Sequence, residues 1–404
     1  MNRYLFLVLF SLIALAVKAQ NAENVTPIIS YLLLDNSPTT PPPGCTDAGD
    51  NDSDRILNCY ETNTNIFVNA QNTGTDPNNP DTDGDAIKDG DEVLGTVAGL
   101  NLPSMGVNPL RKNILLEYDW FDDNLDCPSH SHRPTAAAIA SYTAAMANAP
   151  NVNPDGSTGI TAINDYGQGG VFTGGNFIDD VNGVLVGGVN QSEFGLYKAA
   201  NFDALRNGYF HYVILPHHYN TTSGSSGQAE LPGDDLIVSL QCFSSTRNTS
   251  HTILHELGHN LGIRHGGDSN CNHKPNYNSV MNYKYQFPGV DTNCDSNPEA
   301  ISVLDLSRNA NIDLNENNLN ENSGVCAVAP VAINWNGING IESSISFNIN
   351  SADDFESDNC GGLQTVLEDY NDWGNISFTG LSDFDGMNLT SMEIINCNNP
   401  APQN

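Results

Sequence analysis

The alternation of apolar and polar segments along the chain predicts a small set of strands and helices. Residues 113–121 and 209–216 are rich in β-branched and aromatic residues, which predicts two buried strands. Residues 135–149 are alanine-rich and end before Pro150, which predicts a helix. A second helix is expected to carry the histidine-rich stretch that begins at residue 251. Because glycine-broken, strand-like segments lie between these elements, the order predicts an α/β (α+β) domain with a mixed sheet.

The distribution of these segments also predicts how the chain is divided. Residues 1–19 have a positive residue, an apolar run and a small-residue cleavage site, which is typical of a secretory signal peptide; a membrane anchor is less favoured because the run is short. No later segment is apolar enough to cross a bilayer. Residues 20–46 are expected to form a linker. Residues 47–110 are expected to form an irregular acidic region, and residues 111–308 are expected to form the compact domain. The Asn-rich residues 309–404 form either a separate small β domain or a tail wrapped on that domain.

The net charge of the chain argues against some classes of binding partner. It contains 48 acidic residues and 14 Lys and Arg, so its formal net charge is −34. Such a chain repels phosphate backbones and anionic membranes, which argues against nucleic-acid binding. An acidic composition can also indicate disorder, but 39% of the residues are hydrophobic and they are well patterned. The acidic residues are therefore candidates for cation ligands.

Two twelve-residue windows, 50–61 and 81–92, repeat one pattern of carboxylates. Both have acidic residues at positions 1, 3, 5 and 12, which is the ligand spacing of a calcium loop. Calcium takes six to eight oxygen ligands, and without a cation so many carboxylates would repel one another. The alternative, a solvated acidic linker, is less favoured because the register is shared. About two calcium sites are expected, with the ligands Asp50, Asp52, Asp54, Asn58 and Glu61 in the first and Asp81, Asp83, Asp85, Asp89 and Glu92 in the second.

These windows depart from EF-hands. Position 6 is Arg55 in one and Ala86 in the other, where glycine is usual, and no amphipathic helix precedes either window. The pattern over residues 45–95 resembles thrombospondin type 3 repeats. The resemblance implies that calcium organises irregular chain with little core.

The nine cysteines of an exported chain are expected to form disulfides rather than thiolate sites for a metal. The local pairs Cys45–Cys59 and Cys271–Cys294 are the expected bridges. The count is odd, so one thiol is left over.

The stretch HTILHELGHNLGIRH, residues 251–265, has the spacing of a zinc site. His255 and His259 lie on one face of a helix, one turn apart, and Glu256 is placed to act as general base on a metal-bound water. His265 would face away if the helix continued. The chain must therefore turn back, and Gly262 stands where a left-handed residue is needed to end the helix.

This stretch resembles the consensus of the metzincin metallopeptidases. The resemblance implies a catalytic α/β domain whose active-site helix holds one zinc ion, with Met281 as the methionine turn beneath it. It also implies that Tyr283 either approaches the zinc and stabilises the oxyanion or only packs. Gly266, after the third histidine, matches none of the well-known branches. No cysteine-switch motif is evident before Arg111, and Cys45 as a thiol that caps the zinc is less expected than Cys45 in a disulfide.

Two functions follow as hypotheses. The first is a secreted zinc endopeptidase, stabilised by calcium, that hydrolyses protein or peptide substrates bound as an added strand. The second is a calcium-dependent surface or matrix-binding protein with a non-catalytic peptidase-like domain; the retained Glu256 argues against it. The remaining histidines, including His130, His132 and His217, are expected to have surface or packing roles. The oligomeric state is not predicted.

Overall fold

The fold is described from a computed structural model, over residues 45–123, 130–180, 182–220, 224–299, 302–338, 340–350, 360–379 and 393–397. The predicted signal peptide and most of the predicted linker lie outside these ranges. Among the described residues, no helix combines the length and apolarity that crossing a membrane requires.

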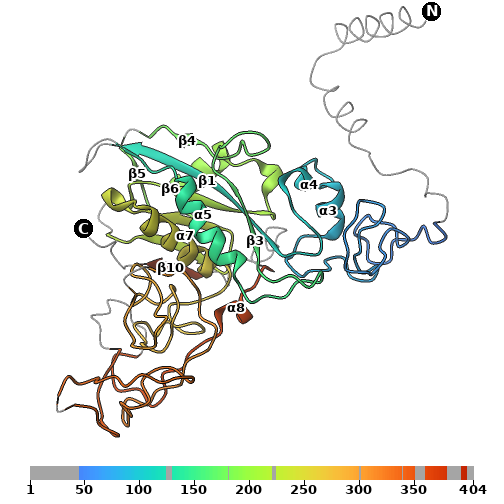
Figure 1. The fold of residues 1–404 in the computed structure, drawn as a ribbon. Helices are drawn as coiled ribbons and strands as arrows, with labels where there is room; N and C mark the ends of the chain where they lie inside the picture. Colours follow the sequence, from blue (N-terminus) through green and yellow to red (C-terminus); the bar gives the residue numbers. More distant parts are fainter. Residues whose placement is uncertain are drawn as a thin grey trace, which may run out of the picture.

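A mixed eight-stranded sheet forms the centre of the molecule (Figure 1). Its main path runs β10 (Glu393–Cys397), β8 (Gly227–Leu231), β9 (Asp235–Val238), β6 (Phe210–Leu215), β1 (Asn113–Asp123) and β2 (His130–Ser131), and β3 (Thr161–Asp165) and β4 (Phe177–Ile178) also pair with β1. The long strand β1 is parallel to β3, β4 and β6, whereas β8 is antiparallel to both of its neighbours. The predicted mixed α/β architecture is confirmed.

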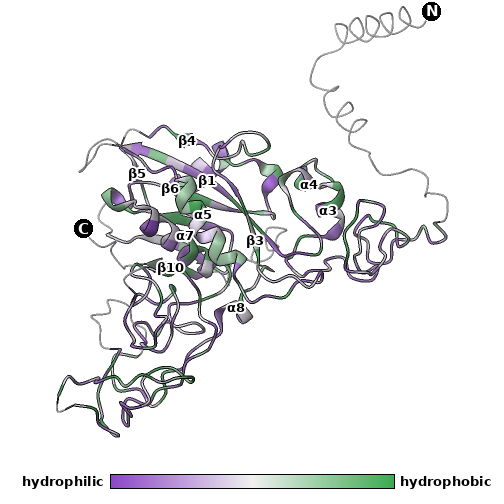
Figure 2. Cartoon of the chain, in the orientation of Figure 1, coloured by the Kyte–Doolittle hydropathy of each residue, from purple (hydrophilic) through white to green (hydrophobic). Residues whose placement is uncertain are grey.

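Strands β1 and β6 are apolar along most of their length because both faces of the sheet are covered. On one face, α5 (Ala136–Ala147) and α7 (Thr246–Asn260) share a core with Leu116 of β1 and Val213 of β6. On the other face, α6 (Ser192–Asn201) packs through Phe194 near Ile214 of β6. In Figure 2, α5 carries hydrophobic colour along much of its length. Alternate residues of one strand thus serve two cores.

Several shorter helices and strands flank this body. Helices α3 (Asp89–Leu94) and α4 (Leu102–Met105) follow the second acidic loop, and the short strands β5 (Val184–Leu185) and β7 (His218–Tyr219) pair with each other. The short helix α8 (Asp372–Asn375) belongs to the C-terminal extension, and its Trp373 lies in the same core as α5 and α7.

The described parts of the extension, residues 309–338, 340–350 and 360–379, are largely irregular, and buried carboxylates organise them. Glu316 accepts backbone N–H bonds from Ile349 and Gln364, and Glu321 accepts those of two further residues. Both glutamates are fully buried. Each ties together distant turns that have no sheet ladder to join them.

Three disulfides join described cysteines. Cys45–Cys59 is confirmed. The expected Cys271–Cys294 bridge is wrong, because Cys271 pairs with Cys360 and Cys294 pairs with Cys326. Both observed bridges fasten the extension to the preceding domain. The prediction failed because it favoured the nearest cysteine in sequence, whereas the extension folds back over this region.

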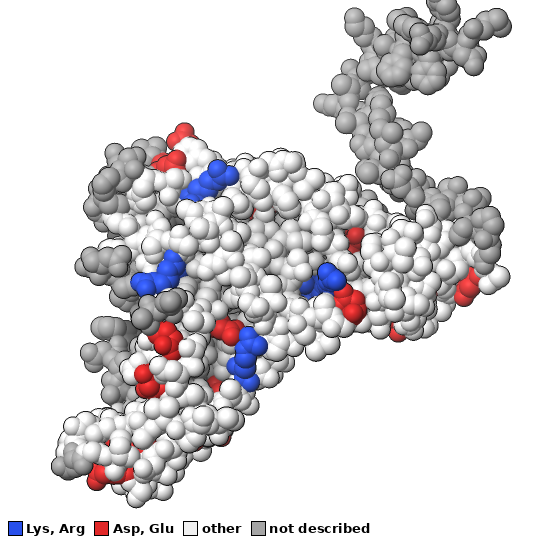
Figure 3. All heavy atoms as spheres, viewed as in Figure 1, with Lys and Arg blue, Asp and Glu red and all other residues white. Residues whose placement is uncertain are grey.

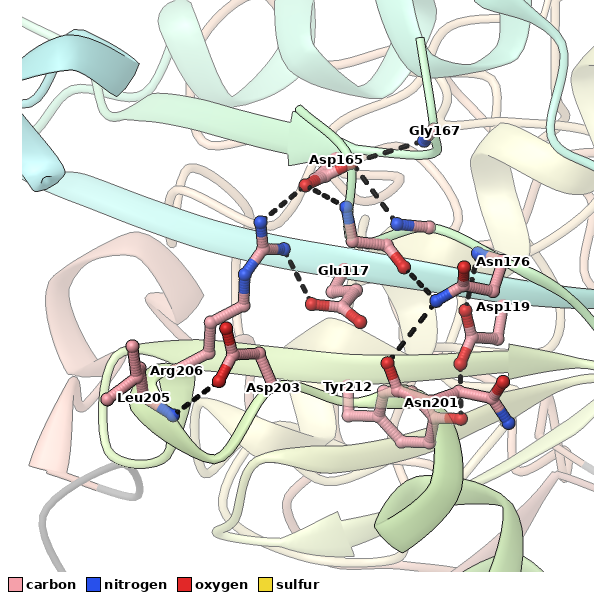
Figure 4. A network of polar contacts seen from close by, with 12 residues as sticks. Glu117, Asp119, Asp165, Gly167, Asn176, Asn201, Asp203, Leu205, Arg206 and Tyr212 are labelled. Carbon is pink, nitrogen blue, oxygen red and sulfur yellow. Dashed lines mark hydrogen bonds and ion pairs between the residues drawn. The ribbon is translucent and has the colours of Figure 1, made fainter. Parts of the chain in front are cut away.

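A buried ion-pair network lies on the sheet at β1 (Figure 4). The Arg206 guanidinium donates to Glu117 at 2.5 Å and to Asp165 at 2.6 Å, and all three side chains are almost fully buried. Burial raises the pKa of Glu117 to about 8, although Arg206 opposes the shift. The cation is therefore what makes two buried carboxyl groups tolerable between packed strands.

Replacing Arg206 with Met should destabilise the fold by about 3–5 kcal/mol, since it leaves two buried acids without their cation. Denaturant unfolding measures this. The control Arg308→Met removes a partly exposed pair with Asp305 and should cost less than about 1 kcal/mol. Equal losses in the two variants would contradict the importance of the buried network.

Candidate metal centre

Helix α7 carries the histidines, and its two ends are defined by specific residues. Ser245 caps the N-terminus by accepting the Asn248 N–H at 3.1 Å. At the other end the helix stops at Asn260, and Gly262 adopts a φ of 92°. A Cβ atom on Gly262 would meet nothing within 4 Å, so glycine is required for conformation and not for space. The chain then turns back towards the helix.

This turn brings three imidazoles together. The ring centroids of His255 and His259 are 4.8 Å apart, and that of His265 lies 5.2 and 4.8 Å from them. All three side chains are buried. The Nε2 atoms of His255 and His259 are 3.2 Å apart.

The hydrogen bonds behind two of these rings fix their tautomers. His255 Nδ1 lies 2.8 Å from the Val280 carbonyl oxygen, and His259 Nδ1 lies 2.7 Å from that of Ile263. A carbonyl only accepts, so each Nδ1 carries the proton and each Nε2 presents a lone pair. Burial also lowers the pKa of His255 to about 3 and that of His259 well below its usual value. The rings are therefore neutral, as metal ligands must be.

The donor set fits zinc. Two lone pairs at 3.2 Å repel each other unless a cation lies between them. A tetrahedral zinc ion with bonds to nitrogen of about 2.05 Å would hold two such nitrogens about 3.3 Å apart.

A fourth donor from the end of the chain, Cys397, completes the group. Its Sγ lies 3.2, 3.4 and 3.7 Å from the Nε2 atoms of His255, His259 and His265. A zinc–sulfur bond of about 2.3 Å would give a nitrogen–sulfur separation of about 3.6 Å. Cys397 lies outside the three disulfides described above and is fully buried. Cys45, considered as a thiol that caps the zinc, is instead in a disulfide.

Glu256 is fully buried next to these donors, and its Oε2 accepts from Cys397 Sγ at 3.2 Å. Strand β8 passes close to it: a Cβ on Gly227 would lie 2.2 Å from Glu256 Oε1. The backbone of the strand can approach the carboxylate because this residue is glycine.

Met281 lies directly beneath the helix. A Cβ on Gly258 would come within 2.3 Å of the Met281 sulfur, so the glycine within the HELGH sequence lets the methionine pack there. Asp372 holds the surrounding turn by accepting from the Tyr277 hydroxyl at 2.7 Å and the Ser279 hydroxyl at 2.6 Å. This support comes from the C-terminal extension, and no local pattern in the sequence revealed it.

The Tyr283 ring packs against the ligands, 4.5 Å from the His265 ring and 5.9 Å from the His255 ring. Gly266 has a separate explanation: a Cβ there would lie 2.4 Å from the Cys271 carbonyl oxygen. The residue that follows the third histidine is thus fixed by a tight turn that ends at a disulfide.

The two acidic windows share one backbone conformation. In each, the first aspartate accepts N–H bonds from positions 4 and 6, the position 5 aspartate accepts from position 7, and the position 9 side chain accepts from position 2. Arg55 and Ala86 at position 6 have φ of 85° and 72°, so they take up the left-handed conformation that glycine usually supplies. The repeat in sequence is therefore a repeat in structure.

The carboxylates of these loops converge in small groups. Asp54 and Asp89, from different loops, join Glu61 in one group, and two further groups follow the loops themselves: Asp50, Asp52 and Asp54, and Asp81, Asp83 and Asp85. Glu92 is buried and accepts from the Asn113 side chain. Asn58 differs, because its amide nitrogen donates to Asp47.

Several of these oxygens are buried and lack a hydrogen-bond donor among the described residues, namely oxygens of Asp52, Asp54, Glu61, Asp83 and Glu92. Burial, with the neighbouring carboxylates, raises the pKa of Asp83 to about 9 and that of Glu61 to about 8. Acidic side chains are sparse on the face of the molecule drawn in Figure 3, in keeping with the burial of so many carboxylates.

Residues 291–299 form a third loop of the same kind that the sequence reasoning missed. Asp291 accepts from positions 4 and 6, Asp295 accepts from Asn297, and Glu299 accepts from Thr292, as in the other two loops. The spacing of Asp291, Asn293 and Asp295 was the available signal.

Three histidines that were expected to have surface or packing roles also lie together. The ring centroids of His130 and His132 are 4.5 Å apart, and His217 lies 5.7 and 5.4 Å from them. Their nitrogens form a potential ligand group. By contrast, His251 is bonded through Nδ1 to the Gln286 carbonyl and through Nε2 to Ser302.

Comparison with known proteins adds little to this geometry. No family model matches the chain, and no curated protein matches it. One similar solved structure is archaemetzincin from Methanopyrus kandleri, with 13% identity, a TM-score of 0.22 and coverage of 43% of this chain and 81% of that chain. So low a similarity carries no argument about function, and the functional proposals rest on the site itself.

Proposed function

We propose that the chain is a secreted zinc-dependent endopeptidase. The observation that carries the proposal is the convergence of the His255, His259 and His265 imidazoles next to the buried carboxylate of Glu256. A purely structural zinc site has no use for a carboxylate in this place, whereas hydrolysis requires a base there. Disulfides are compatible with an extracellular location.

His255, His259 and His265 would hold the ion, which when bound would polarise a peptide carbonyl and acidify a water molecule. Glu256 would take the proton of the attacking water and pass it to the leaving amine. Gly227 allows the β8 backbone to run close to this carboxylate, so a peptide lying along β8 would have its bond near the base. Tyr283, packed on His265, is placed to orient that ring, and as a catalytic residue it stays a proposal.

We also propose that calcium occupies the two acidic loops. The support is the set of buried carboxylate oxygens without donors, which a divalent cation would satisfy. The resemblance to thrombospondin type 3 repeats stays part of this proposal. A calcium-dependent surface or matrix-binding protein with an inactive domain is the competing function, and Glu256 separates the two.

Glu256→Gln should keep zinc but lower peptide hydrolysis by about 10²–10⁴-fold, since the amide cannot act as a base. Zinc content and cleavage of a peptide library should be measured both in the full chain and in a chain that ends at residue 392, because Cys397 lies on the histidines. Glu368→Gln, on an exposed side chain, is the control. Equal cleavage by Glu256→Gln and the unmodified chain would rule out the assigned base.

Calcium should stabilise the chain strongly at pH 8 and weakly at pH 5. In the cation-free fold the raised pKa values of Asp83 and Glu61 keep protons that the unfolded chain, with pKa values near 4, releases. Stability without calcium should therefore fall as the pH rises from about 4 to about 9. With calcium at a hundredfold excess over its dissociation constant, each site should restore about 3 kcal/mol at pH 8.

The test is thermal unfolding in EGTA with added zinc, with and without calcium, at both pH values. Asp83→Asn should reduce the calcium effect at pH 8, whereas Asp122→Asn, at an exposed position, should not. A calcium effect of the same size at pH 5 and pH 8 would be inconsistent with proton competition at these carboxylates.

A further inference from the structure

Strand β10 occupies the edge of the sheet next to the metal centre. Residues Glu393 to Cys397 pair antiparallel with β8, with Glu393 opposite Leu231 and Cys397 opposite Gly227. Without β10, strand β8 would be the open edge. An open edge with free N–H and C=O groups next to a hydrolytic site is where an extended peptide binds by strand addition.

Three kinds of contact hold β10 in place. The Cys397 carbonyl accepts from the Ser226 backbone at 3.1 Å and from the Ser225 hydroxyl at 2.5 Å. Ile395 and Cys397 are buried against Leu231. At the other end, Glu393 forms an ion pair with Arg264, next to the ligand His265.

The register of this strand sets the position of the thiol. Because Cys397 lies opposite Gly227, its side chain reaches the point where three imidazoles and Glu256 converge. In the hydrolytic reaction that point belongs to the water and the peptide carbonyl.

We propose that residues 393–397 are a built-in inhibitor: β10 fills the peptide-binding edge of β8, and the Cys397 thiolate is the fourth ligand of the metal. This inference rests on the proposed peptidase function, because it takes β8 to be the edge that binds substrate. It also identifies the ligand class of that edge as an extended peptide that runs antiparallel to β8. Release of the C-terminal segment opens both the edge and the metal.

The coordination part is tested by zinc-edge X-ray absorption on the full zinc-loaded chain. We expect one sulfur neighbour at about 2.3 Å in the unmodified chain and none in Cys397→Ser. A zinc shell of nitrogen and oxygen alone in the unmodified chain overturns the proposal and leaves the peptidase function standing.

The inhibition part is tested by peptide cleavage. Deletion of residues 393–404 should raise the rate about 100-fold, because a tethered occupant competes at an effective millimolar concentration with micromolar substrate. Deletion of 398–404, which keeps Cys397, is the matched control and should stay latent. A full chain as active as the 393–404 deletion overturns the inhibitor. Sulfur in the zinc shell together with an inactive 393–404 deletion counts against the peptidase function instead.

A second inference comes from the group of His130, His132 and His217. The nitrogens of these residues lie within 4.8 Å of one another, and His132 and His217 are buried. His130 Nε2 lies 3.3 Å from the Gln241 carbonyl oxygen. His130 belongs to β2, His132 follows β2 directly and His217 lies in the turn after β6, whereas β10 lies at the opposite end of the strand order from β2.

The geometry points to a second transition-metal site at these three imidazoles. Imidazole nitrogens select zinc, copper or nickel over calcium. One nitrogen of each ring could bind the same metal ion, because the three rings bring these nitrogens into one small volume.

Metal analysis of the full chain after dialysis against zinc tests this site. We expect two zinc ions per chain, one of which is lost in His132→Ala and the other in His259→Ala. His130→Ala, at a half-buried position, provides a second variant in case His132→Ala does not fold, which circular dichroism would reveal. One zinc ion in the unmodified chain, or two in folded His132→Ala and His130→Ala, overturns the second site.

Discussion

The metal centre depends on one constraint: three buried imidazoles must each direct a ring nitrogen to one point. For His255 and His259, the backbone carbonyls of Val280 and Ile263 meet this constraint by accepting hydrogen bonds from Nδ1–H on the far side of each ring. Each of these carbonyls belongs to a turn outside α7. The glycine turn after α7 supplies one, and the turn that carries Met281 supplies the other. The path of the chain through these two turns therefore also sets the orientation of the two rings.

The acidic loops solve the opposite problem, because they bring like charges together and bury them. Their backbones are organised by side chain to backbone hydrogen bonds, which in Asp54 and Asp83 use one oxygen and leave the other buried without a donor among the described residues. Asp89 of the second loop reaches into the group of the first, so the loops are coupled. The same carboxylates thus fix the backbone conformation of the loops and bring together oxygens that a cation would neutralise.

Local sequence patterns predicted the parts of the molecule whose determinants are local. The spacing of His255, His259 and His265 predicted a helix that must turn back at Gly262, and shared register predicted two matching loops. Contacts across the fold were not predictable in this way. Cys397 and His255 are 142 residues apart, and Asp372 lies 93 residues from Ser279. The odd number of cysteines predicted one thiol outside the disulfides. The position of that thiol depends on the pairing of β10 with β8. The Cys271–Cys294 prediction failed for the same reason.

The contribution of Asp372 to the turn around Met281 has a consequence for biosynthesis. The polypeptide is made from the N-terminus, so the ligands and the methionine exist well before the carboxylate that Tyr277 and Ser279 need. A nascent chain shorter than 372 residues contains the histidines, but it lacks the carboxylate that holds the turn around Met281. The strand that covers the histidines comes later still, since Glu393, where β10 begins, lies 21 positions after Asp372. The support beneath the centre and the strand that covers it are thus synthesised only a short stretch of chain apart.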